Sequence, residues 1–462
     1  MLSYNQALDF IHGLNRFGTK LGLHNITKLL EILENPHDGI KIIHVAGTNG
    51  KGSTCAMIDS ILRSAGFRVG LYTSPYLEVF NERMRVNGEN IPDDDLARLT
   101  DKVYEAVIYM RQNNLGSPTE FEVVTAIGFL YFKEQAVDFL VLEVGMGGRL
   151  DATNVVTPVV SVITPISIDH QQYLGNTLKS IAREKCGIIK PMVPVVSGPQ
   201  EPEAMMVIEQ TCDLLKCSMT KVISVDNYKS VTNINYKLVS DNINSMVFDL
   251  NTPRNIYPSL KIGLLGRHQL DNAATAVGAI EALTVVDVNI KSDAIYSGLE
   301  KTKWVGRSEI IYDNPIVLID GAHNIAGIKT LRHTIERFFR GKKKILVLGV
   351  LEDKDYEDML KEIVPIANTI ITTAPESPRA LPANRLLEAI VDIFCDTVIR
   401  RDIKDVNIEE RASKDNRIKL YSEQKIDNAI KLANSLADSQ DMIIFVGSLY
   451  MIGHVRSLLK KE

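Results

Sequence analysis

Short apolar segments alternate with amphipathic helical segments along this chain of 462 residues, and this alternation is the strongest constraint on its fold. In the first half, four apolar segments are each followed by a turn or helix signal: Ile42–Val45, Val69–Thr73, Phe139–Val144 and Val159–Thr164. After the first of them, apolar residues at helical spacing predict a helix over Ser53–Ala65, which Gly66 would end. Strands that alternate with helices form mainly parallel sheets with helices on both faces.

The pattern changes over residues 221–265. The segments KLVSDNINSMVFDL and SLKIGLLG predict three strands there, which we expect to be a small antiparallel addition to the first domain. Helical periodicity returns over residues 271–283, and a second α/β block begins near Trp304. Its expected strands are Ile316–Ile319, Lys344–Leu348, Thr369–Thr373, Arg417–Tyr421 and Met442–Val446. We therefore expect two domains, over residues 1–300 and 301–462.

Composition and charge exclude several classes of protein. Hydrophobic residues make up 45% and charged residues 24%, as in soluble globular proteins, and the net charge of −5 argues against a general nucleic-acid binder. No apolar run reaches the roughly 18 residues of a membrane span, and the first residues do not resemble a secretory leader. Five scattered cysteines are typical of a reducing compartment; Cys212 and Cys217 could suggest a metal pair, but no second pair stands at ligand spacing. We expect a cytoplasmic protein with no membrane or nucleic-acid partner.

The sharpest local signal is the glycine-rich segment HVAGTNGKGST at residues 44–54, between an apolar strand and a helix. Backbone N–H groups at such a helix start hold phosphate oxygens. The usual loop reads GxxxxGK[ST]; here Gly52 displaces the hydroxyl residue by one place, which disfavours a generic motor or GTPase. The predicted phosphate loop, in which Lys51 would reach the β- and γ-phosphates, comprises Gly47, Thr48, Asn49, Gly50, Lys51, Gly52 and Ser53. The structural alternative is a glycine-rich turn without a ligand.

Polar residues follow three expected strands of the first domain. Ser74 follows the second, Glu143 stands at the end of the third, and Asp169 and His170 come after the fourth. Ligands of open parallel sheets collect beyond the carboxyl ends of strands, so these residues predict a site for Mg²⁺ and ATP. Taken singly, Ser74 could only cap a turn and Glu143 could be an ordinary charge at a strand end.

The second domain begins with a similar group. Asp320, His323 and Asn324 follow its first expected strand, in the segment IVLIDGAHN. The same residues could instead form an Asx turn with a surface histidine. Lys185, in AREKCGII, has the pattern of a solvated lysine on a helix face.

Six motifs taken together are characteristic: GTNGKGS, LEVGMGGRLDATN, REKCGI, GRHQLDNA, DGAHN and GSLYMIG. The chain resembles the folylpolyglutamate synthase and dihydrofolate synthase family of the Mur ligase superfamily, over about residues 21–456. The segments TSPYLEVFNERMRVNG (73–88) and LEVGMGGRLDATN (142–154) narrow the resemblance to the folate branch. It implies a P-loop ATPase domain, mainly parallel with a small antiparallel addition, and a C-terminal Rossmann-like α/β domain that acts as the glutamate ligase domain.

The resemblance also implies a role for individual residues. Residues 47–53 would bind the phosphates of ATP, with Lys51 acting in catalysis. Lys185 would carry a carbamate that binds a second Mg²⁺, which replaces its solvated interpretation. The remaining implied roles are Mg²⁺ ligands at Ser74, Glu143 and His170, nucleotide contacts at Asn272 and Arg307, and a second-domain pair, Asp320 and His323, that closes over ATP. Two positions depart from the common pattern, since Tyr76 replaces a histidine and Cys186 an alanine; Tyr76 puts the substrate preference in doubt.

The implied reaction is ATP-dependent addition of L-glutamate to folates, and also to dihydropteroate, through an acyl phosphate, in a monomeric enzyme of folate biosynthesis. His323 would orient the attacking amine or accept its proton. Two alternatives remain at this point. One is a superfamily ligase acting on peptidoglycan precursors, and the other is a P-loop ATPase that forms no amide.

Overall fold

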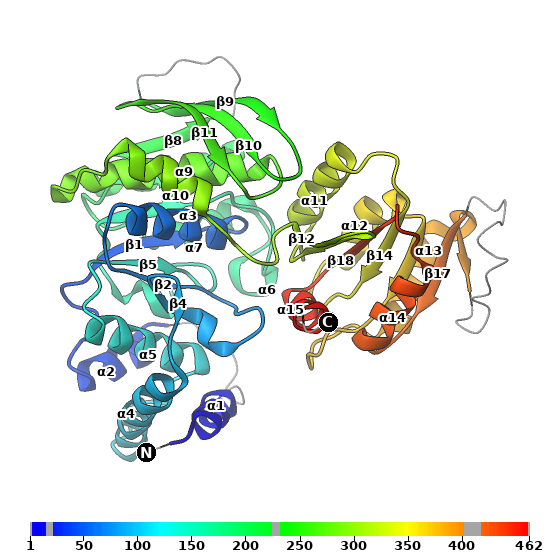
Figure 1. Ribbon diagram of the computed structural model, residues 1–462. Coiled ribbons are helices and arrows are strands. Elements are labelled where there is room, and N and C mark those ends of the chain that lie inside the picture. The colour runs from blue at the N-terminus through cyan, green and yellow to red at the C-terminus, as the bar shows by residue number, and fades with distance from the viewer. Residues whose placement is uncertain (1, 15–21, 224–231, 402–416, 461–462) are drawn as a thin grey trace. The chain divides into compact units, whose positions relative to one another are not determined.

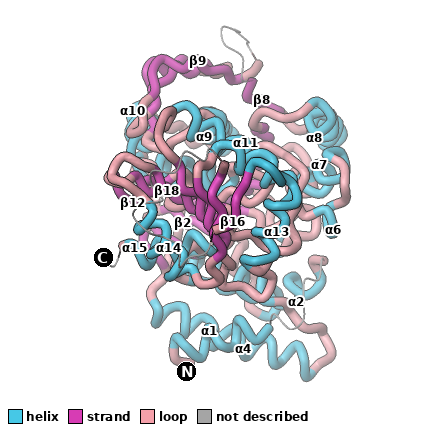
Figure 2. Tube along the Cα trace, turned by 90° about the vertical axis from the view of Figure 1, so that its right-hand side faces the viewer, coloured by secondary structure: helices cyan, strands magenta, loops and turns pink. Residues whose placement is uncertain are grey.

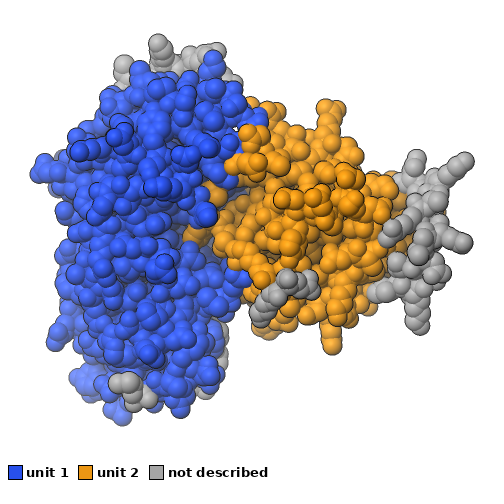
Figure 3. Space-filling view, in the orientation of Figure 1, with its two compact units in different colours: residues 1–241, 245–263, 268–303 blue, residues 242–244, 264–267, 304–462 orange. Residues whose placement is uncertain are grey.

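The chain forms two compact units, each with its own sheet (Figure 1). The computed structural model describes residues 2–14, 22–223, 232–401 and 417–460. Unit 1 comprises residues 1–241, 245–263 and 268–303, and unit 2 comprises residues 242–244, 264–267 and 304–462 (Figure 3). The two short segments of unit 2 that precede Trp304 interrupt unit 1 in the chain, a division that sequence periodicity does not reveal.

Unit 1 contains one eleven-stranded sheet, in the order β11-β10-β9-β8-β7-β6-β1-β5-β2-β3-β4. The six strands from β8 to β2 in this order are parallel neighbours: β1 (Lys41–Ala46), β2 (Val69–Tyr72), β5 (Phe139–Glu143), β6 (Val160–Ile163), β7 (Val195–Ser197) and β8 (Met219–Ile223). One edge is the short antiparallel pair β3 (Met84–Val86) and β4 (Glu89–Asn90). The predicted parallel sheet is confirmed.

The other edge is the antiparallel addition that the sequence predicts. It consists of β9 (Ile234–Asp241), β10 (Met246–Asn251) and β11 (Ile256–Ile262). The third strand was predicted too late in the chain, because it ends at Ile262 and the glycines of GLLG lie beyond it.

Helices cover both faces of the central strands. Tyr72, Leu140 and Leu142 point into a core formed with α1 (Tyr4–Gly13), α2 (His24–Ile32), α4 (Asp93–Gln112) and α5 (Glu120–Glu134). On the other side, α3 (Lys51–Ser64) packs against β1, β2 and β5, and α9 (His268–Ala282) packs against β6, β7, β8 and β9. Both α9 and α10 (Ser292–Lys301) also pack against α3. The remaining helices are α6 (Gln171–Leu174), α7 (Leu178–Cys186) and α8 (Pro202–Leu215). Because β2, β5 and β6 are buried throughout, their sequences are almost continuously apolar.

Unit 2 contains a seven-stranded sheet, in the order β12-β13-β18-β14-β15-β17-β16. Figure 2 shows its strands β12, β18 and β16 in magenta. Its strands are β12 (Glu309–Asp313), β13 (Ile316–Asp320), β14 (Lys344–Leu348), β15 (Thr369–Thr372), β16 (Val398–Arg400), β17 (Ile418–Ser422) and β18 (Met442–Val446). All neighbours are parallel except β12 and β13. The Rossmann-like α/β prediction is therefore confirmed, with an antiparallel edge strand added.

The helices of unit 2 form two groups. One core joins the sheet to α11 (Ile325–Phe338), α12 (Tyr356–Ile363) and α13 (Ala383–Phe394). The other group is the contacting pair α14 (Ile426–Leu436) and α15 (Leu449–Leu459), which reach β14 and β18. Across the described parts of both units, no helix combines the length and the apolar character that crossing a bilayer requires.

Candidate active site

The glycine-rich loop connects β1 to α3 at the carboxyl end of the parallel strands. Gly47 has φ +152° and Gly50 has φ +86°, and residues other than glycine rarely adopt such backbone conformations. A Cβ on Gly47 would lie 1.8 Å from Oγ1 of Thr164, and a Cβ on Gly50 would lie 2.3 Å from Oδ1 of Asn272. At both positions, therefore, the backbone conformation and the lack of space for a Cβ each favour glycine over any other residue. Because Gly50 makes the turn, α3 begins at Lys51, two residues before the predicted start.

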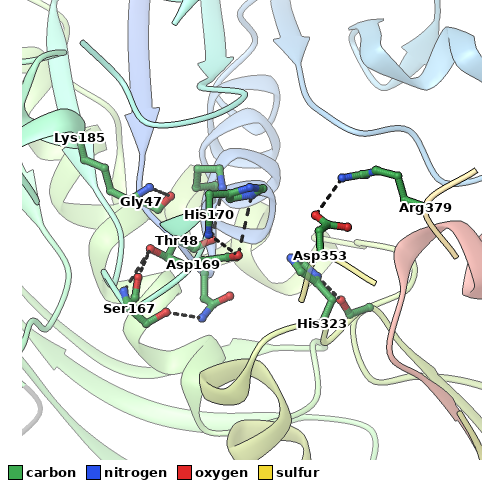
Figure 4. A network of polar contacts seen from close by, with 12 residues as sticks. Gly47, Thr48, Ser167, Asp169, His170, Lys185, His323, Asp353 and Arg379 are labelled. Atoms are coloured by element: carbon green, nitrogen blue, oxygen red, sulfur yellow. Dashed lines mark hydrogen bonds and ion pairs between the residues drawn. The ribbon is translucent and has the colours of Figure 1, made fainter. Parts of the chain in front are cut away.

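The loop is anchored to the segment that follows β6. The amides of Thr48 and Asn49 donate to the carbonyl of Pro165 at 3.0 and 3.2 Å. The hydroxyl of Thr48 donates to the carbonyl of Ser167 and accepts from its amide, both at 3.1 Å, and Nδ2 of Asn49 donates to Oγ of Ser167 at 3.2 Å (Figure 4). These contacts fix the position of Thr48 and Asn49. The backbone amides that follow belong to the first turn of α3. Sequence patterns gave no signal for Ser167.

Two lysines lie at this loop. The ammonium of Lys51 donates to the carbonyl of Thr48 at 3.3 Å. That of Lys185, on α7, donates to the carbonyl of Gly47 at 2.7 Å (Figure 4). Lys185 is only 4% exposed, so the solvated interpretation of its helix face is wrong. Burial lowers the pKa of Lys185 to about 7, and the charge of Lys51 acts in the same direction.

The predicted metal ligands Ser74 and Glu143 lie side by side at the carboxyl ends of two adjacent parallel strands, with Ser74 two residues beyond β2 and Glu143 the last residue of β5. The amide of Ser74 donates to Oε2 of Glu143 at 3.1 Å, and the Glu143 side chain is buried at the end of β5. His170 lies at the start of α6, seven residues beyond β6, with its amide 2.8 Å from Oδ1 of Asp169 (Figure 4). Within the described ranges, no three His, Cys, Asp or Glu side chains gather as a group able to hold a metal ion.

A buried chain of amides connects the phosphate loop to α9. Nε2 of Gln269 is 3.5 Å from Oγ of Ser53, and Nδ2 of Asn272 donates to Oε1 of Gln269 at 2.9 Å. Gln269 is fully buried, and Asn272 also packs against Gly50. Gln269 thus links Ser53 to Asn272. Both of these were predicted as site residues from the sequence, whereas Gln269 was not. The motif GRHQLDNA contains Gln269, but neither composition nor spacing distinguishes it from a helix-face amide.

A second buried network lies behind the glycines that follow Glu143. Asp151 accepts hydrogen bonds from the amide of Met146 at 2.8 Å and from Oγ1 of Thr153 at 2.6 Å. Nε2 of His44 lies 2.9 Å from the same Oγ1. Burial lowers the pKa of His44 to about 3, so this imidazole is neutral at physiological pH. The network fixes the turn next to Glu143.

In unit 2 the Asp320 carboxylate is largely occupied by neighbouring donors. It accepts hydrogen bonds from the amide and hydroxyl of Ser308 at 2.7 and 3.0 Å, and from the amide of Ala322 at 2.8 Å. The bond to Ala322 is the Asx turn that the sequence allowed as an alternative. Burial raises the pKa of Asp320, although the neighbouring charge of Arg307 opposes this shift.

Arg307 and His323 lie around the same turn. A Cβ on Gly321 would lie 2.2 Å from Nη1 of Arg307, so this guanidinium packs directly against the glycine. Nδ1 of His323 is 2.8 Å from the carbonyl of Gly321. Unit 2 therefore brings Arg307, Asp320 and His323 together within one loop cluster.

Comparison with known families accounts for most of the chain. Residues 45–280 match the family described as Mur ligase middle domain. Residues 306–449 match the family described as Mur ligase, glutamate ligase domain.

Individual relatives match over most or all of the chain. The chain is 37% identical over 460 residues to a dihydrofolate synthase/folylpolyglutamate synthase of Bacillus subtilis, covering 99% of both chains. It is 36% identical over 388 residues to a folylpolyglutamate synthase of Lacticaseibacillus casei, covering 82% of this chain and 88% of the relative. The crystal structure of Mycobacterium tuberculosis folylpolyglutamate synthase complexed with ADP and AMPPCP superposes with a TM-score of 0.86, at 30% identity and with 100% of both chains covered.

Proposed function

Because the chain belongs to the dihydrofolate synthase and folylpolyglutamate synthase family of Mur ligases, we propose that it joins L-glutamate to folates, and also to dihydropteroate, with ATP as co-substrate. The protein is an ATP-dependent ligase. The observation that carries the proposal is the glycine loop at the start of α3, packed against Asn272 and hydrogen-bonded to a buried lysine. This arrangement suits a nucleoside triphosphate whose terminal phosphoryl group is to be transferred.

The reaction requires activation of a carboxylate. A carboxylate oxygen is a poor leaving group, so an amine does not displace it in neutral water. Transfer of the γ-phosphoryl of ATP gives an acyl phosphate and ADP, and attack by the amine of L-glutamate then forms the amide and releases phosphate. The protein must neutralise charge on the transferred group and exclude water from the intermediate.

Residues of unit 1 would hold the triphosphate. The amides at the start of α3, from Gly50 to Ser53, would bind phosphate oxygens, and Lys51 would neutralise their charge. Thr48 and Asn49 would act by keeping the loop open, since their amides are already bonded to Pro165. Asn272 would contact the nucleotide from α9.

The donor set of unit 1 fits Mg²⁺ bound jointly with phosphates. Ser74, Glu143 and His170 supply a hydroxyl, a buried carboxylate and an imidazole, too few for a cage made by the protein alone. Mg²⁺ is usually held by one or two carboxylates together with substrate phosphates and water, which this set allows. When bound, Mg²⁺ would neutralise charge that develops on the phosphoryl group. The family resemblance implies two such ions.

Lys185 is proposed to carry an N6-carboxyl group. Its amine is buried beside the phosphate loop, and desolvation favours the neutral form, which is the form that combines with carbon dioxide. Carboxylation would convert a buried cation into an anionic oxygen ligand for the second Mg²⁺. The remaining N–H could keep its hydrogen bond to Gly47.

In unit 2, Arg307 is proposed to bind the nucleotide, with Asp320 fixing the turn that presents it. His323 is proposed to orient the incoming amine or to accept its proton. The enzyme is proposed to act as a monomer in the cytoplasm, on small molecules only.

The test is ADP release from ATP, Mg²⁺ and L-glutamate, with either dihydropteroate or tetrahydrofolate as sole acceptor and with products identified by mass. We expect turnover with both acceptors and none without L-glutamate. Turnover with only one acceptor would restrict the activity to that one. Turnover with UDP-linked peptidoglycan precursors, or ATP hydrolysis without amide formation, would refute the proposal.

A further inference from the structure

We propose that Arg83 recognises a carboxylate of the acceptor substrate. This inference rests on the proposed function and names the group that would bind one part of its substrate. Arg83 ends the short 3₁₀ helix Phe80–Arg83, in the segment between β2 and β3 of unit 1.

The backbone places Arg83 next to the predicted metal ligands. The amide of Thr73 donates to the carbonyl of Arg83 at 3.0 Å, which continues the antiparallel pairing of β2 with β3. Ser74 is the next residue along the chain, and its amide donates to Glu143. Arg83 is therefore paired with Thr73, the residue just before Ser74. Ser74 and Glu143 mark the region where we propose that the acceptor carboxylate is activated.

The guanidinium of Arg83 is held by aromatic rings instead of acidic groups. Its Cζ atom lies 5.3 Å from the ring centre of Tyr76 and 5.4 Å from that of Phe80. Its Nε atom is buried and has no hydrogen-bond partner among the described residues. Aromatic faces position a guanidinium without using its N–H donors. Acidic groups of the described residues therefore do not neutralise this guanidinium, and an anion that reaches its terminal nitrogens could do so.

Neighbouring arginines behave differently. Arg63 pairs with Asp59 at 2.8 Å, and Arg85 donates to Asn90 at 3.0 Å and lies 3.5 Å from Glu82. Each of them has its polar partner within the protein. Arg83 differs from both because its guanidinium lies against two aromatic rings and not beside a carboxylate or an amide in the part of the chain that the structure describes.

The loop around Arg83 is held rigidly by one carboxylate. Glu82 is 8% exposed and accepts hydrogen bonds from the amides of Leu77, Glu78 and Val79, at 3.0, 3.0 and 3.1 Å. This clamp fixes the segment between Tyr76 and Phe80, whose rings stack on Arg83. A rigid planar guanidinium binds a carboxylate through two parallel hydrogen bonds.

Both proposed acceptors carry a suitable group. Dihydropteroate has a single carboxylate, the one that reacts, on a benzoyl ring. A folate has two on its terminal glutamate, of which one reacts and the other does not. Arg83 binds one of these carboxylates, and the two acceptors distinguish which.

The test compares Arg83→Met, which keeps most of the side-chain volume, and Arg83→Lys, which keeps the charge. Steady-state KM values for each acceptor and for ATP are measured on both variants. The control is Arg98→Met, which removes an exposed guanidinium on α4 that is paired with Asp95 and Glu134. We expect Arg83→Met to raise the acceptor KM at least about 10-fold, with Arg83→Lys intermediate and the KM for ATP within about twofold.

An effect confined to tetrahydrofolate assigns Arg83 to the unreactive carboxylate, and an effect on both acceptors assigns it to the reactive one. An unchanged acceptor KM in Arg83→Met, or an equal rise in the KM for ATP, overturns the proposal. If the unmodified protein turns over neither acceptor, the proposed function fails; direct binding of tetrahydrofolate to the protein and to Arg83→Met then tests Arg83 separately. If Arg83→Met does not fold, the same comparison is made with Arg83→Lys, whose single ammonium cannot form the two parallel bonds.

Discussion

The ammonium of Lys185 lies 2.7 Å from the carbonyl oxygen of Gly47, the first glycine of the phosphate loop. A helix-face lysine from α7 is thereby buried at the start of the loop that would hold the triphosphate. No acidic partner is needed for this contact, since a backbone carbonyl accepts the hydrogen bond. The position makes Lys185 part of the site instead of part of the surface.

Lys185→Ala is expected to reduce the ligase rate at least about 100-fold, the scale of losing one preorganised charged group at a reacting phosphoryl. If the residue acts as a carboxylate, added acetate should restore part of the rate. The unmodified protein, incubated with carbon-13 bicarbonate, should show a carbamate signal in its NMR spectrum that Lys185→Ala lacks. A full rate in the alanine variant would contradict the assignment.

Lys51→Ala is expected to lower ATP turnover about 1,000-fold while leaving the fold intact, because the variant lacks the cation that we propose to lie at the transferred phosphoryl group. The measurement is ADP release, together with circular dichroism and thermal unfolding. Lys28→Ala serves as control, since Lys28 is an exposed lysine paired with Glu31 in the same unit. A folded Lys51→Ala protein with a near-normal rate would refute the phosphate-loop assignment.

A comparison of Gly50→Ala with Gly39→Ala distinguishes the effect of backbone strain from the effect of contact with Asn272. Gly50 and Gly39 have φ values of +86° and +79°, but a Cβ at Gly39 meets nothing within 4 Å, whereas a Cβ at Gly50 meets Oδ1 of Asn272. Both alanine variants should lose about 1 kcal/mol of stability from the left-handed backbone. Only Gly50→Ala should also raise the KM for ATP, because it displaces the Asn272 amide. Equal KM values in the two variants would show that this contact has no part in nucleotide binding.

The pH dependence of stability should reveal the buried imidazole of His44. Its pKa is about 3 in the folded protein against 6.5 for the ordinary group, so the unfolded chain takes up a proton first as the pH falls. The stability contribution is complete above pH 6.5 and is lost progressively between pH 6.5 and pH 3. Between pH 7 and pH 5.5 the loss amounts to about 1 kcal/mol.

The measurement is the free energy of unfolding in urea at several pH values, for the unmodified protein and for His44→Gln. The difference between the two proteins should shrink by that amount over the stated range. His24→Gln, at an exposed position, should show no such change. A pH-independent difference between His44→Gln and the unmodified protein would contradict the folded-state pKa.

The sequence predicted the elements that have a clear period, and it failed where tertiary packing decides. Strands β1, β5 and β18 were found almost to the residue because each is apolar throughout and ends at a turn. The antiparallel strand β11 was displaced, since its alternating exposed and buried residues give a weak signal before the apolar segment GLLG. The edge strand β12 was also missed. Its residues are half-buried or exposed, so it is not apolar throughout as a central strand is.

The roles of the site residues stay predictions, but their placement in the fold shows what local sequence can reveal. The glycines and the lysine of the phosphate loop are recognisable locally, because the loop's conformation depends on neighbours in the sequence. The burial of Lys185 depends on α7 packing beside Gly47, which is 138 residues away in the chain, and no local pattern reveals such a contact. The same holds for Gln269, whose partner Ser53 is 216 residues away. The donors that occupy Asp320 come partly from Ser308, outside its own motif.

The clamp formed by Glu82 has a consequence for how a ligand would associate with this surface. Three successive amides, those of Leu77, Glu78 and Val79, donate to one buried carboxylate. These bonds order the loop when the chain folds, so less of its conformational entropy should remain to be lost on association. We therefore expect association against this loop to need little rearrangement of the backbone, and its rate to depend on ionic strength where a charged group such as Arg83 receives an anion.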